Sequence, residues 1–213
     1  MLTVYGFPSA RSSRVVWALE EAGVEYEYIY VDVKAGAGWQ PEYRALNAGG
    51  KVPTLVHDGF VLTESAAICT YIGDCFPSAR LVPQVGTQER ARYNQWCYFA
   101  LSELEQPLWT INKHTFALPE QRRVSAILDT ARWEFAVAAQ VLAAGLGRRE
   151  FIIDEHFSAA DILITHTLSW ARALEVPLGN EHLEAYAARL LARPAWIRAR
   201  QRERAEVAAS ARS

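Results

Sequence analysis

The pattern of apolar residues changes near residue 77, and this change constrains the fold more than any other feature of the sequence. Before it, short segments rich in β-branched and aromatic residues alternate with segments whose apolar residues recur at helical spacing. After it, helical spacing continues almost without interruption. The first part therefore predicts the order βαβ, a short helix, then ββα, which is a compact α+β layer arrangement. The second part predicts an all-helical bundle.

The expected elements of the first part follow from local signals. A strand, a helix ending at Gly23 and a second strand form a βαβ unit with a right-handed crossover, so the sheet begins parallel. Asp58-Gly59 is the two-residue signature of a type I′ turn, which predicts an antiparallel hairpin around it. Strands are expected at 2–7, 26–33, 53–57 and 60–63, and helices at 12–22, 40–46 and 64–76.

Pro77, Pro83 and Gly86 mark a connection between two domains. We therefore divide the chain into an α/β domain at 1–77, a linker at 78–86 and an all-helical domain at 87–213. Helices are expected in the second domain at 87–117, 120–144, 158–174, 181–191 and 195–208.

Composition limits the function classes. With 22 basic and 24 acidic residues the net charge is -2, which gives no general attraction to nucleic acid or acidic membranes. No apolar run is long enough for a membrane helix, and the N-terminus runs into a strand pattern, so we expect a cytoplasmic protein. The three cysteines lack a CxxC and the five histidines lack metal-ligand spacing, so we expect no disulfide framework and no metal.

The C-terminal segment is rich in charges of both signs. Such alternation is typical of a solvated helix end, and we expect that role here. The residues concerned are Arg198, Arg200, Arg202, Glu203, Arg204 and Glu206.

Three motifs, in this order along the chain, resemble the cytosolic glutathione transferase superfamily. The first is YGFPS at residues 5–9, with Arg14-Val15 after it, as in the classes that use serine. The second is KVPTL at 51–55, followed by TESAAI at 63–68. The third is FSAADI at 157–162, in the helical part. The resemblance covers nearly the whole chain. It is to the bacterial-type, serine-using members of the superfamily in particular.

The resemblance implies a thioredoxin-like first domain that binds glutathione as co-substrate. It implies an enzyme, a glutathione transferase, which joins the glutathione thiolate to small hydrophobic electrophiles and serves in detoxification. It also implies a homodimer. A glutathione-dependent isomerase, dehalogenase or peroxidase on the same fold, or a non-catalytic binding module, remain open alternatives. The sequence names neither the physiological electrophile nor the dimer interface.

The second motif implies the residues that hold glutathione. The family's counterpart of Pro53 is cis, which exposes the backbone of Val52 for strand-like pairing with the cysteinyl part of the tripeptide. Ser65 begins a helix, where backbone N–H groups favour a carboxylate, here that of the γ-glutamyl group. Glu64 then holds the γ-glutamyl ammonium. Lys51 is a candidate for the glycyl carboxylate, although a lone loop lysine is usually solvated.

Transfer requires a thiolate, and a free thiol is largely protonated at neutral pH. A hydroxyl at the start of a helix favours the anion by hydrogen bonding and by the helix dipole. Ser9 has this position and matches the family's serine when the motif is aligned on Arg14. Tyr5, Arg11 and Ser12 are the alternatives.

The helical part carries the candidate residues for the second substrate. Tyr98, Ser102, Glu105 and Trp109 recur at i, i+4, i+7 and i+11, which places them on one face of a regular helix. That face mixes aromatic and polar groups, as a pocket wall does, and the family places its electrophile cleft near this helix. Trp170 is a candidate to close the pocket.

The third motif has a structural interpretation. Ser158 and Asp161 have the spacing of a capping box, with Phe157 and Ile162 as its hydrophobic staple. We expect these residues to begin a helix and to have no catalytic part.

Overall fold

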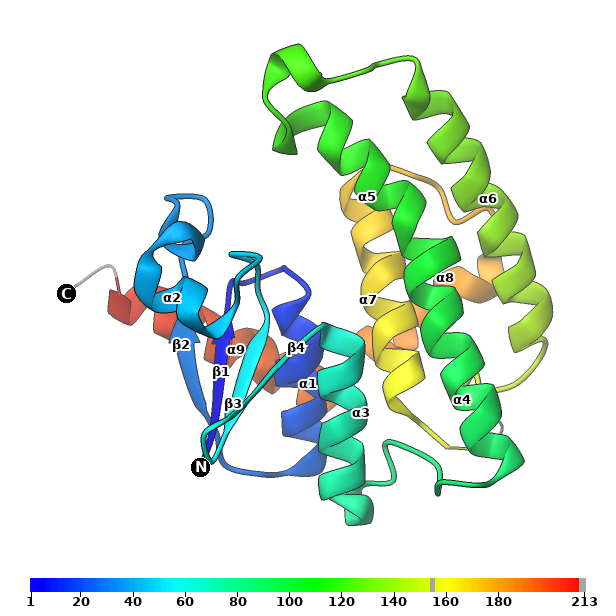
Figure 1. The fold of residues 1–213 in the computed structure, drawn as a ribbon. Helices are drawn as coiled ribbons and strands as arrows, with labels where there is room; N and C mark the ends of the chain where they lie inside the picture. The colour runs from blue at the N-terminus through cyan, green and yellow to red at the C-terminus, as the bar shows by residue number, and fades with distance from the viewer. Residues whose placement is uncertain (154–155, 211–213) are drawn as a thin grey trace. The chain divides into compact units, whose positions relative to one another are not determined.

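The computed structural model describes residues 1–153 and 156–210 and divides the chain into two compact units (Figure 1). The first unit comprises Met1–Val82 together with Ala192–Ser213. The second comprises Pro83–Leu191.

The first unit is built on a four-stranded mixed sheet in the order β2-β1-β3-β4. β1 pairs parallel to β2 and antiparallel to β3, and β3 pairs antiparallel to β4. Asp58 and Gly59 both have positive φ, as the predicted type I′ turn requires. The strands are β1 Leu2–Gly6, β2 Glu27–Tyr30, β3 Thr54–His57 and β4 Phe60–Thr63.

Helices cover this sheet and enclose the core of the unit. α1 packs against α3 and α9, and α9 also packs against β2 (Figure 1). Trp17 of α1 is fully buried and meets Trp196 of α9 with ring centroids 4.9 Å apart. The helical elements are α1 Ser12–Ala22, η1 Ala37–Trp39, α2 Pro41–Leu46, α3 Ser65–Cys75, η2 Pro77–Ala79 and α9 Pro194–Ser210.

The second unit is helical, as the apolar spacing predicts. α5 packs against α6, and α7 packs against both α4 and α8. No helix in the described part of the chain is long and apolar enough to cross a membrane. The elements are α4 Gln88–Phe99, η3 Ala100–Glu105, α5 Gln106–Asn112, η4 Lys113–Ala117, η5 Glu120–Arg122, α6 Ile127–Leu146, α7 Ala159–Ala173 and α8 Glu181–Leu191.

The segment expected as one helix at 87–117 is interrupted twice by π-helical turns, η3 and η4. Pro107 follows η3 closely and has no backbone N–H to donate to the carbonyl of Glu103. A π-helical turn takes more residues than an α-helical turn, so it changes which side chains share a face. This matters for the residues that the sequence places on one side of the helix.

The expected fold class is confirmed: a βαβ-α-ββα domain precedes an all-helical region. The compact units have other bounds than the predicted domains, since the first unit extends to Val82, within the predicted linker. The helical domain was expected to extend over 87–213, whereas α9 belongs with the first unit because it packs on α1 and β2. Residues 154–155 and 211–213 of that range lie outside the described residues.

The capping box is confirmed at the start of α7. Asp161 is fully buried and accepts hydrogen bonds from the backbone N–H and the hydroxyl of Ser158, at 2.9 and 2.8 Å. It also accepts from the backbone N–H of Ile152 at 2.8 Å and the hydroxyl of Tyr186 at 2.7 Å. One carboxylate therefore joins α7, α8 and the segment before α7.

Candidate functional site

The register of the sheet brings three predicted site segments to one edge of the first unit. Tyr5, at the end of β1, pairs with Thr54, and Thr54 pairs with Thr63 at the end of β4. The turn after β1, the residues before Thr54 and the residues after Thr63 therefore leave the sheet at the same edge. These are the segments that carry Ser9, Val52-Pro53 and Glu64-Ser65.

The Val52-Pro53 peptide bond is cis, as the resemblance implies. The loop before it is held by α2. Tyr43 donates a hydrogen bond from its hydroxyl to the carbonyl of Lys51 at 2.6 Å, and Asn47 donates its amide to the same carbonyl at 2.8 Å. The Lys51 side chain is exposed. The backbone approaching Pro53 is therefore fixed by side chains, while the lysine is accessible to an anion.

Glu64 and Ser65 stand where β4 passes into α3. Glu64 is exposed and has φ 67, a left-handed conformation that is uncommon for a residue with a side chain. Ser65 is buried, and its Oγ accepts a hydrogen bond from Nη1 of the fully buried Arg14 at 3.3 Å. Arg14 thereby links α1 to the start of α3, and its positive charge lies at a position predicted to hold a carboxylate.

Ser9 lies in the turn between β1 and α1, with an exposed side chain and φ 63. Its Oγ accepts a hydrogen bond from Nη2 of Arg200, on α9, at 2.8 Å. The sequence did not point to Arg200 as a neighbour of Ser9, because the two are 191 positions apart.

The expectation that the charged C-terminal segment is a solvated helix end is wrong for two of its residues. Glu203 has 0% exposure, and Arg200 forms an ion pair with it. Burial raises the pKa of Glu203, and hydrogen bonds from Ser13, Arg200 and the backbone of Ser9 oppose that rise. α9 faces α1 instead of solvent at these positions, which a pattern of alternating charge does not reveal.

Ser12, one of the alternatives to Ser9, is engaged by the turn itself. Its Oγ accepts from the backbone N–H of Phe7 at 3.0 Å and donates to the carbonyl of Phe7 at 2.7 Å. A hydroxyl has one proton to donate, so Ser12 has none left for a sulfur atom in this arrangement. Tyr5 lies within β1, its ring 5.8 Å from that of Tyr43.

Comparison with known proteins identifies the family. The family model described as "Glutathione S-transferase, N-terminal domain" matches residues 1–74. The glutathione S-transferase GST-4.5 of Xanthomonas campestris pv. campestris is 30% identical over 192 residues, covering 90% of this chain and 93% of that protein. The chain belongs to the glutathione S-transferase family.

Solved structures agree with this assignment. The ternary complex of BphK, a bacterial glutathione S-transferase, superposes on this transferase with a TM-score of 0.85 at 29% identity, covering 94% of this chain and 98% of that one. The glutathione transferase URE2P6 of Phanerochaete chrysosporium, in complex with oxidized glutathione, gives a TM-score of 0.82 at 26% identity, covering 96% and 97%. The thioredoxin-like fold of the first domain is thus confirmed.

The residues that the sequence assigns to the second substrate all lie in the helical unit of this transferase. The rings of Trp109 and Trp170 have centroids 6.3 Å apart, so α5 and α7 bring these two residues together. The ammonium of Lys113 lies 6.0 Å from the centre of the Trp109 ring. Glu105 is buried, with 5% exposure.

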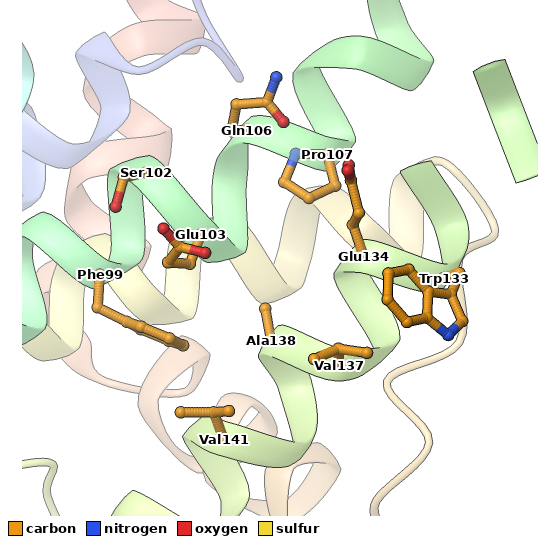
Figure 2. A pocket seen from close by; sticks show the side chains of 10 residues that line it. All are labelled: Phe99, Ser102, Glu103, Gln106, Pro107, Trp133, Glu134, Val137, Ala138 and Val141. Carbon is orange, nitrogen blue, oxygen red and sulfur yellow. The ribbon is translucent and has the colours of Figure 1, made fainter. Parts of the chain in front are cut away.

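Tyr98 and Ser102 occupy a different environment. Tyr98 is exposed, and the Ser102 hydroxyl donates to its carbonyl at 3.0 Å. Ser102 also lines a pocket of about 280 Å³ whose other wall is α6, with Val137 and Val141 (Figure 2). The π-helical turn η3 contains Ser102 and precedes Trp109, and it changes the helical phase. Residues at i and i+11 therefore do not share one face as they would in a regular helix.

The described residues contain no group of three or more His, Cys, Asp or Glu side chains placed to hold a metal ion.

Proposed function

We propose that this transferase binds glutathione at the sheet edge defined by Ser9, Val52-Pro53 and Glu64-Ser65 and adds its thiolate to small hydrophobic electrophiles. The observation that carries this proposal is the register of β1, β3 and β4, which brings the three segments to one edge. Glutathione-bound relatives of the same fold support it. We also propose a cytoplasmic location and a part in detoxification, both on the basis of the family.

Each part of the tripeptide has a proposed partner. The backbone of Val52 pairs with the cysteinyl residue in the manner of an added strand. The N-terminus of α3 and the Ser65 hydroxyl take the γ-glutamyl carboxylate, and Glu64 takes the ammonium of the same group. Lys51 takes the glycyl carboxylate.

The proposed reaction begins with loss of the thiol proton to solvent and stabilisation of the thiolate by the Ser9 hydroxyl. The sulfur then supplies the electron pair of a new carbon–sulfur bond. In a displacement the leaving group departs with the electrons of its own bond, and in an addition the electrophile takes up a proton. Catalysis comes from proximity and from thiolate stabilisation.

For the electrophile, the proposed contacts among the residues predicted from the sequence are Glu105, Trp109 and Trp170, because Tyr98 and Ser102 lie in a different environment. The pair Trp109 and Trp170 has the best support, because two neighbouring aromatic rings offer an apolar surface for stacking. Glu105 adds a buried polar group in the same helical unit.

Replacement of Glu64 by glutamine is expected to raise the dissociation constant for glutathione about tenfold or more. The change keeps the size of the side chain and removes the charge that holds the ammonium, and hydrogen bonds to charged groups contribute about 1.5–3 kcal/mol. Isothermal titration calorimetry with reduced glutathione measures the effect.

Glu25→Gln is the matched control. Glu25 is an exposed glutamate of the same unit, located just before β2 and away from the proposed edge. It should bind glutathione like the wild type. Equal affinity in all three proteins would exclude Glu64 from the site, and no binding by the wild type would end the proposed function.

We further propose a homodimer in which α6 lies at the interface. Three apolar side chains are exposed on α6 at intervals of four residues, hence on one face: Trp133, Val137 and Val141. Trp133 is 66% exposed. These residues line the pocket of Figure 2 together with polar residues, among them Glu103 and Glu134, and exposed apolar side chains gathered on one helix face are typical of contacts between identical subunits.

Trp133→Glu is expected to shift the protein from dimer to monomer in sedimentation velocity at micromolar concentration. A charge in the centre of an apolar interface loses its hydration without gaining a partner. Ala185→Glu, an exposed change on α8, is the control and should leave the sedimentation coefficient unchanged. A wild type that sediments as a monomer would refute the interface.

A further inference from the structure

α9 and the residue just before it are fixed against α1 by two ion pairs. Arg193 donates from Nε and Nη2 to the two carboxylate oxygens of Glu21 at 2.6 and 2.8 Å. Arg198 donates to Oε2 of Glu20 at 2.8 Å and to its carbonyl at 3.0 Å. Both acidic partners lie on α1. The position of α9 relative to the end of α1 is therefore set by several directional contacts.

Farther along α9, Arg200 and Glu203 reach the turn that carries Ser9. Arg200 donates to the Ser9 Oγ at 2.8 Å and pairs with Glu203. Glu203 accepts from the Ser13 hydroxyl at 2.7 Å and from the backbone of Ser9. One ion pair thus contacts the side chain and the backbone of Ser9 together.

Stability alone gives little reason for an ion pair at this place. Glu203 has no exposed surface and the Arg200 side chain is only 21% exposed, so both charges have lost hydration. Well-packed apolar residues often stabilise a buried site as well as such a pair does, or better. The pair is therefore better explained by its contacts with Ser9 than by the packing of α9.

The chemistry of the contact limits where the Ser9 proton can point. A serine hydroxyl has one proton and two acceptor lone pairs, whereas a guanidinium only donates. Arg200 therefore occupies a lone pair of Ser9 and cannot take its proton. The positive charge also polarises the hydroxyl and makes it a better donor to a third atom.

We propose that Arg200, held by Glu203, is a positioning residue that orients the Ser9 hydroxyl as hydrogen-bond donor to the glutathione thiolate. This proposal rests on the proposed function, and it assigns the C-terminal helix a part in activating the thiol. Arg200 acts through Ser9 and need not touch glutathione itself.

The test uses Arg200→Met, which keeps the length of an apolar stem beside Trp196 and removes the charge. The pH dependence of kcat/KM for conjugation of an aryl halide reports the pKa of the thiol. Arg200→Met is expected to raise that pKa by about one unit, which lowers turnover about tenfold at pH values below both pKa values and about threefold at pH 7. The dissociation constant for glutathione should stay within about twofold of the wild-type value.

Arg198→Met is the matched control. It removes the same group from the same helix and breaks an ion pair with α1, but its partner is Glu20 and not Ser9. It should leave the pH profile unchanged even where it lowers the melting temperature. Arg200→Lys keeps the charge without the planar fork and is expected to restore part of the lost turnover.

A double-mutant comparison then separates positioning of the Ser9 hydroxyl from a general electrostatic effect of the Arg200 charge on the thiol. If Arg200 acts through the Ser9 hydroxyl, Arg200→Met should have no further effect on the pH profile in a Ser9→Ala background. The positioning role would be overturned by an unchanged pH profile in Arg200→Met, or by an equal pKa shift with and without the Ser9 hydroxyl. In either case, glutathione binding by the wild type would leave the proposed function standing. Absence of glutathione binding would remove both.

Discussion

Asp161→Ala is expected to lower the free energy of unfolding by about 4 kcal/mol, which places it among the most destabilising single changes in the chain. The carboxylate is fully buried and accepts four hydrogen bonds, from Ile152, from the backbone and hydroxyl of Ser158, and from Tyr186. Alanine leaves these donors without an acceptor in a buried place, and each costs about 1–3 kcal/mol if it stays unpaired. For a chain of this size the melting temperature should fall by roughly 10 °C.

Two further variants serve as references for the stability loss of Asp161→Ala. Tyr186→Phe removes one of the four donors and should cost about 1 kcal/mol. Asp129→Ala removes a carboxylate that is 98% exposed and pairs with Arg132 at 3.2 Å, so it should cost less than about 0.5 kcal/mol. Differential scanning calorimetry compares all three. A melting temperature for Asp161→Ala equal to that of Asp129→Ala would show that the network does not stabilise the fold.

The fold could be predicted from the sequence because its local signals agree with one another. α1 and α8 have the bounds that their spacing predicts, and Asp58-Gly59 forms the turn that its residue types favour. The capping box at Ser158 is equally local, since both partners lie within one helical turn. Features of this kind depend on neighbours in the chain, which a single sequence contains.

The relation between α9 and Ser9 could not be predicted in this way. Arg200 lies among alternating charges, and no periodic pattern distinguishes the buried Glu203 from the exposed Arg204. The register of β3 and β4 could be predicted, because the Asp58-Gly59 turn fixes it. The register of β1 and β3 could not, because no turn joins these two strands. The phase change at η3 was not accessible from helical spacing, although Pro107 is a local sign that the helix there is irregular.

Ser9→Ala is expected to lower kcat/KM for conjugation of an aryl halide about 25-fold at pH 7. Loss of the hydroxyl donor should raise the pKa of the bound thiol by about two units, from about 6.5 to the value of about 8.5 for a free thiol, so that the thiolate fraction at pH 7 falls from about three quarters to about 3%. The ultraviolet absorbance of the bound thiolate, titrated with pH, measures this shift directly. Affinity for glutathione should change by less than about threefold, because the proposed partners of the tripeptide, Val52, Glu64 and Ser65, are unchanged.

The backbone at Ser9 makes a second substitution necessary. With φ 63, Ser9 has a conformation that glycine adopts without penalty and alanine does not. Ser9→Gly therefore removes the hydroxyl without adding strain, and it should lose as much turnover as Ser9→Ala. If Ser9→Gly kept wild-type turnover, the hydroxyl would have no part in catalysis. Tyr5→Phe, which removes the phenolic hydroxyl from β1, tests the alternative. If Tyr5 activates the thiol, this variant should lose turnover. If Ser9 does so, Tyr5→Phe should conjugate the aryl halide at the wild-type rate.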